Sequence, residues 1–250
     1  MSDASADEKE IVSVSANGAE AETAEDSLSG TALEKVCRKE ADYCQPMYVL
    51  LREVIKLWYK LDYGLKIVGQ ENIPASGSCI AASNHMSLLD PPLVAIAVNT
   101  RQVHFVAKKD LFQTPVLGTI LAHCGCMWVD RSSKDGKAVN QAIDMLSHGR
   151  MVGIFPEGTR SKDGKLGRCK LGVAFMALKA GAPILPMCIF NTLEAGKRSG
   201  LPYRAGLHVR IGKPIPVEKK DNPGPSDMKR ICTLVREKIK ELQDLGPIAD

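Results

Sequence analysis

DGKAVNQAIDMLSHGRMVGIFPEGTRS, residues 135–161, shows in one stretch how this chain is organised. Residues 135–148 are typical of a helix, and Gly149 follows at the position where helices commonly end. Residues 151–155 form a short apolar run, as in a buried strand. Pro156 and Gly158 then require a tight loop. The stretch predicts a helix, a strand, and a polar loop at the carboxyl end of that strand.

The same alternation of apolar runs and helical segments extends over residues 64–250. We expect strands at 65–69, 78–83, 103–108, 126–131, 151–155, 183–190 and 207–212. We expect helices at 91–98, 110–122, 135–148, 168–180 and 225–243. Such alternation is typical of an α/β domain. The sequence therefore predicts a mixed, largely parallel sheet of about seven strands flanked by helices, in one domain that covers 64–250.

Residues 1–30 differ in composition from the rest of the chain. They contain eight acidic residues and one lysine, a net charge of −7, and few large apolar side chains. Such a segment cannot bury enough apolar surface to offset the entropy lost on ordering, so we expect a disordered acidic tail. The chain of 250 residues has a net charge of +4, which leaves +11 for the other 220. A basic body favours anionic partners: phosphate-bearing substrates, a membrane surface or nucleic acid.

Residues 31–63 are expected to be an N-terminal helical segment, broken near Pro46. Within 47–61 an apolar stripe recurs at helical spacing and consists of Val49, Leu50, Val54, Leu57, Trp58 and Leu61. Two interpretations remain open. The helix either packs its stripe on the core or lies in a bilayer surface, with Trp58 and Tyr59 at the level of the headgroups.

Several sequence signals are absent. The first residues lack the basic and apolar regions of a secretory signal, and no window of ~18 residues is apolar enough to span a bilayer. We therefore expect a protein on the cytoplasmic side of the cell membrane, with reduced thiols. The segment HCGC at 123–126 has no second zinc-type cluster, so we expect packed thiols and no metal site. No nucleic-acid-binding signature accompanies the basic charge, so we expect no nucleic-acid partner.

The segment NHMSLLD at 84–90 follows a predicted strand and contains His85 and Asp90. An imidazole beside a carboxylate is the minimum arrangement for a general base with an orienting partner. On a regular helix a five-residue separation turns the two side chains ~140° apart, so the segment must bend for them to meet. A structural alternative is that Asp90 caps the helix that begins at Pro91. Both roles are compatible.

The loop FPEGTRS at 155–161 also follows a predicted strand. In α/β sheets, ligands bind beyond the carboxyl ends of the strands. Gly158 permits a close approach of the backbone, and the guanidinium of Arg160 suits a phosphate. The loop therefore predicts a binding site for a phosphate-bearing ligand.

Together, these two segments resemble the first and third signature blocks of the glycerolipid acyltransferases, above all the PlsC-type 1-acyl-glycerol-3-phosphate (lysophosphatidate) acyltransferases. Residues 105–118 and 125–131 resemble the second block, and 182–186 resemble the fourth. A match to FPEGTR arises by chance in roughly one of 10⁵ to 10⁶ chains, and the blocks occur in the family's order. The resemblance covers about residues 65–215 and makes 64–250 an acyltransferase domain.

The resemblance implies transfer of a fatty acyl group from acyl-CoA or acyl carrier protein to the sn-2 hydroxyl of lysophosphatidate, which gives phosphatidic acid. His85 of the HX4D motif would accept the proton of the hydroxyl, and Asp90 would orient the imidazole. No covalent acyl-enzyme is expected, since the chain has no GxSxG segment, and no metal or other cofactor is implied. The residues implied in acceptor binding are Glu157, Gly158, Thr159, Arg160, Arg131 and Lys108.

Two alternatives differ from this prediction. In the first alternative the acceptor is glycerol 3-phosphate or another lysophospholipid, since the motifs indicate only a phosphate-bearing acceptor and an acyl thioester. The other alternative is a non-catalytic peripheral lipid-binding protein, which a basic body and an amphipathic helix would satisfy. The presence of His85, Asp90, Glu157 and Arg160 favours an enzyme, because binding alone does not require a base.

Overall fold

A computed structural model describes residues 46–114, 118–121, 124, 126–129, 136–197 and 206–249. The predicted tail at 1–30 and residues 31–45 lie outside them. The described strands form one seven-stranded sheet in the order β1-β7-β6-β2-β5-β3-β4. Its strands are β1 (Lys66–Val68), β2 (Cys79–Ser83), β3 (Val103–Lys108), β4 (Met127–Val129), β5 (Met151–Ile154), β6 (Ile184–Phe190) and β7 (His208–Ile211).

All neighbouring strands are parallel except β6 and β7, which are antiparallel. The predicted mixed, largely parallel sheet is therefore confirmed. The described helices are α3 (Pro46–Tyr63), α4 (Asp90–Ala97), α5 (Lys109–Phe112), α7 (Lys137–Ser147), α8 (Leu171–Ala180), α9 (Thr192–Lys197) and α10 (Pro225–Asp244). The sequence did not predict α9 or the short 3-10 turn at Gln70–Asn72.

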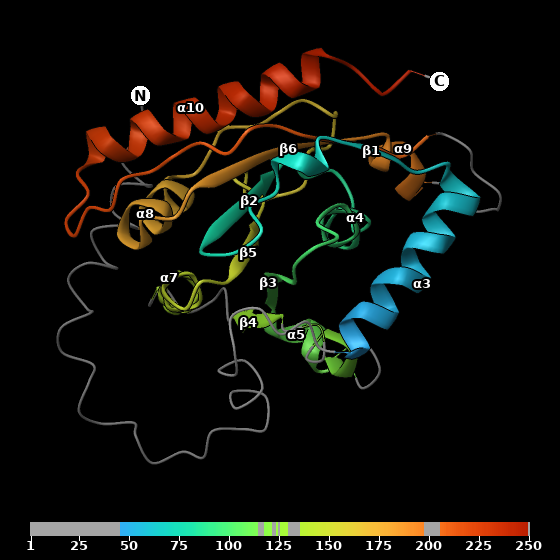
Figure 1. Ribbon diagram of the computed structural model, residues 1–250, viewed down its shortest axis with the longest axis horizontal. Helices are drawn as coiled ribbons and strands as arrows, with labels where there is room; N and C mark the ends of the chain where they lie inside the picture. The colour runs from blue at the N-terminus through green and yellow to red at the C-terminus, as the bar shows by residue number, and fades with distance from the viewer. Residues whose placement is uncertain are drawn as a thin grey trace.

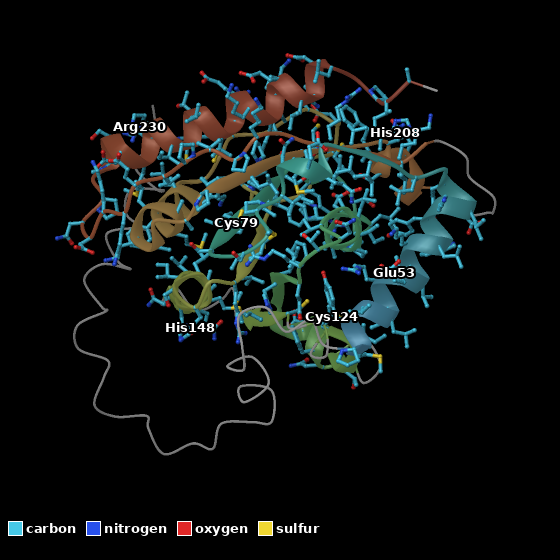
Figure 2. All side chains as sticks on the ribbon, in the orientation of Figure 1. Glu53, Cys79, Cys124, His148, His208 and Arg230 are labelled. Atoms are coloured by element: carbon cyan, nitrogen blue, oxygen red, sulfur yellow. The ribbon has the colours of Figure 1, made fainter. Side chains whose placement is uncertain are left out.

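Helices lie over both faces of the sheet (Figure 1). A hydrophobic layer fills the space beneath the helices on each face. Strand β2 shows the division, because Ile80 and Ala82 join the layer beneath α7, α8 and α10, whereas Cys79 and Ala81 join the layer beneath α3 and α4. Alternate side chains of a strand point to opposite faces, and β2 is buried on both. In Figure 2 Cys79 lies in the middle of the molecule.

Strands β2 and β5 are adjacent and parallel, and this pairing positions the two motifs. Ala82 of β2 is in register with Ile154 of β5. The chain therefore leaves both strands at the same edge of the sheet. The NHMSLLD and FPEGTRS segments begin there side by side, although about 70 residues separate them in the sequence.

Helix α3 uses two faces differently. Tyr48, Tyr59 and Tyr63 are buried against the sheet and α4. Most of the apolar stripe is turned away from the core, with 41–65% exposure for Leu50, Val54, Leu57, Trp58 and Leu61. Val49 of the stripe is half-buried, and Met47, outside the stripe, is also exposed. The interpretation that the stripe packs on the core is therefore wrong, because the tyrosines provide the packing face. The placement of Tyr59 at headgroup level is also wrong, since only 1% of it is exposed. Among the described helices, none has both the length and the apolar run needed to cross a bilayer.

Candidate active site

His85 and Asp90 meet as the sequence predicted. Residues 87–89 turn before α4, and Nδ1 of His85 lies 2.8 Å from Oδ2 of Asp90. A carboxylate can only accept hydrogen bonds, so Nδ1 carries the proton and Nε2 keeps its lone pair. Asp90 is fully buried, whereas the side chain of His85 is 16% exposed. The imidazole can thus accept a proton at Nε2 while the buried carboxylate holds the other nitrogen.

Asp90 begins α4 but does not cap it in the predicted way. The N-cap is Leu89, and no side-chain cap hydrogen bond is present there. Instead Oδ2 of Asp90 accepts the backbone N–H groups of Met86 and Ser87, at 2.6 and 2.7 Å. These donors lie before the helix, so the carboxylate tightens the turn that carries His85. The prediction that Asp90 is the N-cap of this helix is therefore wrong.

Glu157 joins the two motifs. Its Oε1 accepts the backbone N–H of His85 at 3.0 Å, and its Oε2 accepts the N–H of Gly167 at 2.9 Å. The backbone N–H of Ser161 donates in turn to the carbonyl of His85 at 2.7 Å. With both oxygens directed at backbone groups, the carboxylate fixes the position of His85 relative to the loop. These contacts favour a positioning role for Glu157 over the predicted contact with the acceptor.

Aromatic packing supports the imidazole from one side. The ring of Phe155 stacks on His85 with centroids 4.0 Å apart and planes at 16°. Phe105 lies behind it, 6.1 Å from Phe155. Gly153 leaves room for this arrangement, because a Cβ there would lie 2.3 Å from the ring of Phe105. Sequence reasoning did not find either support, since both depend on neighbouring strands.

The rest of the FPEGTRS loop is partly exposed at the same edge. Gly158 has a φ of +69°, in the left-handed region that favours glycine, and a Cβ would lie 3.0 Å from the side chain of Lys170. Thr159 and Arg160 are exposed, so they are accessible to a ligand. Lys108 ends β3, which runs parallel to β5 and so ends at the same edge; its side chain lies outside the described part. Arg131 also lies outside the described residues.

The backbone N–H groups nearest His85 already have acceptors, so none of them is free to stabilise an oxyanion. The N–H of His85 is taken by Glu157, and those of the next two residues are taken by Asp90. Among the described residues no base is hydrogen-bonded to the buried hydroxyl of Ser87, which accepts the N–H of Leu89 at 3.3 Å, so Ser87 lacks the activation that a nucleophile needs. Among the described residues, no group of His, Cys, Asp or Glu is placed to hold a metal ion.

Comparisons with known proteins identify relatives of this chain. A family model described as Acyltransferase matches residues 64–190. A chloroplastic 1-acyl-sn-glycerol-3-phosphate acyltransferase of Brassica napus is 31% identical over 202 residues, 77% of this chain and 56% of its own length. A protein of the same name from Borreliella burgdorferi is 36% identical and covers 66% of each chain. The chain spans little more than half the length of its chloroplastic relatives.

A solved structure gives the same result for the fold. The 1-acyl-sn-glycerophosphate acyltransferase PlsC of Thermotoga maritima superposes with a TM-score of 0.64 and 25% identity, over 81% of this chain and 80% of that one. The fold and the sequence of this chain therefore both have relatives among known acyltransferases. The chain belongs to the acyltransferase family.

Proposed function

We propose that this protein transfers a fatty acyl group from an acyl thioester to the sn-2 hydroxyl of 1-acyl-glycerol 3-phosphate, which gives phosphatidic acid. One observation carries the proposal: the His85–Asp90 pair is joined through Glu157 to the FPEGTRS loop. A base and a loop suited to phosphate are thus fixed next to each other. The names of the relatives from Brassica napus and Borreliella burgdorferi support the same acceptor.

In the proposed mechanism, Nε2 of His85 accepts the proton of the acceptor hydroxyl as its oxygen attacks the thioester carbonyl. The buried carboxylate of Asp90 stabilises the imidazolium that forms. The tetrahedral intermediate then collapses, the C–S bond breaks, and the thiolate takes the proton from His85. Arg160 binds the phosphate of the acceptor through its guanidinium. No covalent acyl-enzyme forms.

A panel of acceptors tests the proposed substrate. Oleoyl-CoA or oleoyl acyl carrier protein is supplied with lysophosphatidate, glycerol 3-phosphate or lysophosphatidylcholine, and the lipid product is identified by mass spectrometry. We expect phosphatidic acid from lysophosphatidate at the highest kcat/KM. A higher kcat/KM for another acceptor would move the protein to that reaction. No acylation with any pair would favour the peripheral lipid-binding protein.

We also propose that α3 places the protein on the cytoplasmic surface of a membrane. Its exposed apolar face has no partner among the described residues, and both the acceptor and the acyl chain reside in lipid. Burial of a leucine contributes about 1.5–3 kcal/mol, so the double variant Leu57→Ser/Leu61→Ser should weaken vesicle binding by about a hundredfold or more. Binding is measured by co-sedimentation with phosphatidylglycerol-containing vesicles.

Leu245→Ser provides a matched control. Leu245 is 65% exposed, as is Leu61, but it follows α10, which covers the other face of the sheet. The control should bind vesicles as the wild type does. Equal binding by the wild type and the α3 double variant would contradict the proposed docking.

A further inference from the structure

The two oxygens of Asp90 are treated differently by the fold. Oδ2 accepts three hydrogen bonds, whereas Oδ1 is buried and accepts none in the described part of the chain. A buried acceptor without a donor is costly, above all on a charged group. The polar groups closest to Asp90 therefore decide how well this carboxylate keeps its charge.

Tyr59 brings a hydroxyl to the start of α4. It lies on the buried face of α3, and its hydroxyl donates to the carbonyl of Leu89 at 3.5 Å, which is long for a hydrogen bond. Leu89 directly precedes Asp90 in the chain. Burial, the neighbouring Tyr63 and the charge of Asp90 together raise the pKa of Tyr59. The hydroxyl therefore keeps its proton and lies within the field of the carboxylate.

A second contact from α3 holds the other end of α4. Nη1 of Arg52 donates to the carbonyl of Asn99 at 2.8 Å, just beyond the last turn of α4. Arg52 and Tyr59 are about two turns apart on α3, which matches the length of the eight-residue α4. Helix α3 thus holds α4 at both ends. Because Asp90 is the first residue of α4, its position depends on α3.

The exposed face of α3 lies next to the contact at Leu89. Trp58 precedes Tyr59 and is 41% exposed. Its ring packs edge-on against the rings of Tyr59 and Tyr63, with centroids 5.3 and 5.7 Å away. The aromatic cluster of Trp58, Tyr59 and Tyr63 therefore connects the exposed face of α3 with the start of α4.

We propose that Tyr59 is a positioning residue for the base: from α3, its hydroxyl holds the start of α4 and stabilises the charge of Asp90, which orients His85. The proposal rests on the proposed acyl transfer. The hydrogen of a hydroxyl rotates toward the acceptor that binds it best, and an ionised carboxylate is a stronger acceptor than a carbonyl. Tyr59 is only 1% exposed, so it acts through Asp90 and does not touch a substrate.

The variant Tyr59→Phe removes the hydroxyl and keeps the ring in its packing. One hydrogen bond changes an equilibrium by about two- to tenfold, so kcat with oleoyl-CoA and lysophosphatidate should fall by that factor at an unchanged KM for lysophosphatidate. Tyr48→Phe is the matched control. Tyr48 is also buried on α3, and its hydroxyl accepts the N–H of Val103 of β3 at 3.3 Å. The control should show a similar fall in Tm and keep the kcat of the wild type.

NMR of protein labelled at the histidine nitrogens provides a readout that does not depend on activity. The proton on Nδ1 of His85, which bonds to Asp90, is identified by its absence from the spectrum of His85→Ala. Without the hydroxyl, the carboxylate becomes the stronger acceptor for this proton. The resonance should therefore move downfield in Tyr59→Phe and stay in place in Tyr48→Phe.

The outcomes separate this proposal from the proposed function. An unchanged resonance or an unchanged kcat in folded Tyr59→Phe, or an equal fall of kcat in both variants, would overturn the role of Tyr59 and leave the acyltransferase intact. A raised KM for lysophosphatidate at an unchanged kcat would also overturn it, because the hydroxyl would then serve the acceptor. A shifted resonance in a protein that acylates no acceptor would support the action of Tyr59 on Asp90 and overturn the proposed function.

Discussion

Replacement of Asp90 by asparagine keeps the size of the side chain and removes its charge. Oδ2 of Asp90 accepts three hydrogen bonds, from Nδ1 of His85 and from two backbone N–H groups. The amide oxygen of asparagine can still accept them, so the turn should persist and the loss of stability should be small. The negative charge that stabilises the imidazolium is lost. At ~4 Å and an effective dielectric constant of ~20 that attraction is about 4 kcal/mol.

Four kcal/mol corresponds to about a thousandfold in rate, so kcat of Asp90→Asn should fall by about that factor. The assay is release of thiol from oleoyl-CoA in the presence of lysophosphatidate, with Tm followed by circular dichroism. Asp144→Asn is the matched control, since Asp144 pairs with His148 on α7 with both side chains mostly exposed. It should keep full activity. A folded Asp90→Asn variant with less than a tenfold loss of kcat would refute the role of the carboxylate.

Three further outcomes follow from contacts around the site. Glu157→Gln replaces a carboxylate that accepts two backbone N–H groups with an amide that has only one acceptor oxygen. We expect kcat to fall about tenfold or more, with a nearly unchanged KM for lysophosphatidate. A rise in KM alone would show that Glu157 binds the acceptor instead. Gly153→Ala forces a methyl group into the ring of Phe105, which should lower the free energy of unfolding by about 1–3 kcal/mol in urea titrations; an unchanged midpoint would contradict the packing. Burial raises the pKa of the thiols of Cys79 and Cys188 to about 12, so peptide mapping should find them unalkylated by iodoacetamide at pH 8 in the native protein, in contrast to the urea-unfolded chain.

The raised thiol pKa values also set a direction for stability at alkaline pH. An unfolded thiol releases its proton near pH 9, whereas the folded thiols keep theirs until about pH 12. The unfolded state therefore binds fewer protons in this window, and the stability that is complete below pH 9 falls as the pH rises. Urea unfolding at pH 8 and pH 10.5 measures the difference. Equal or greater stability at pH 10.5 would contradict the burial of these thiols.

The sheet was predictable because its strands are short apolar runs between helices and glycine-marked turns. Residues 151–155 and 78–83 contain β5 and β2, respectively. The adjacency of these two strands was not predictable, since pairing across about 70 residues depends on the whole sheet order. That adjacency is what brings His85 to the loop. The two sequence motifs and their order indicated which residues form the site. The register of β2 and β5 explains how those residues come to lie next to each other.

In helix α3 the sequence did not predict which face packs on the core. Its apolar stripe has the spacing of a packing face, and sequence periodicity cannot tell a face that meets the core from one that meets lipid. The structure buries Tyr48, Tyr59 and Tyr63 instead. The rings of Tyr59 and Tyr63 also pack on each other, with centroids 5.5 Å apart. Tyrosine can serve as a buried side chain when its hydroxyl finds a partner, as Tyr59 does at the carbonyl of Leu89.

The roles of Glu157 and of the backbone around His85 also lay beyond the sequence. The sequence predicted that Glu157, which shares its loop with Arg160, binds the acceptor. Its carboxylate points at two N–H groups that come from segments 72 and 10 residues away. No local pattern encodes such contacts, because the donors belong to the backbone, which any residue carries.

The role of His85 as the base of an acyl transfer is tested by comparing the wild type with a variant that lacks the imidazole. Thiol release from oleoyl-CoA is measured with and without lysophosphatidate, for the wild type and for His85→Ala. We predict release that depends on the acceptor in the wild type and falls by at least ~10²–10⁴-fold in the variant, with Tm and vesicle binding retained. Acceptor-dependent release at the wild-type rate from folded His85→Ala would show that His85 is not the base.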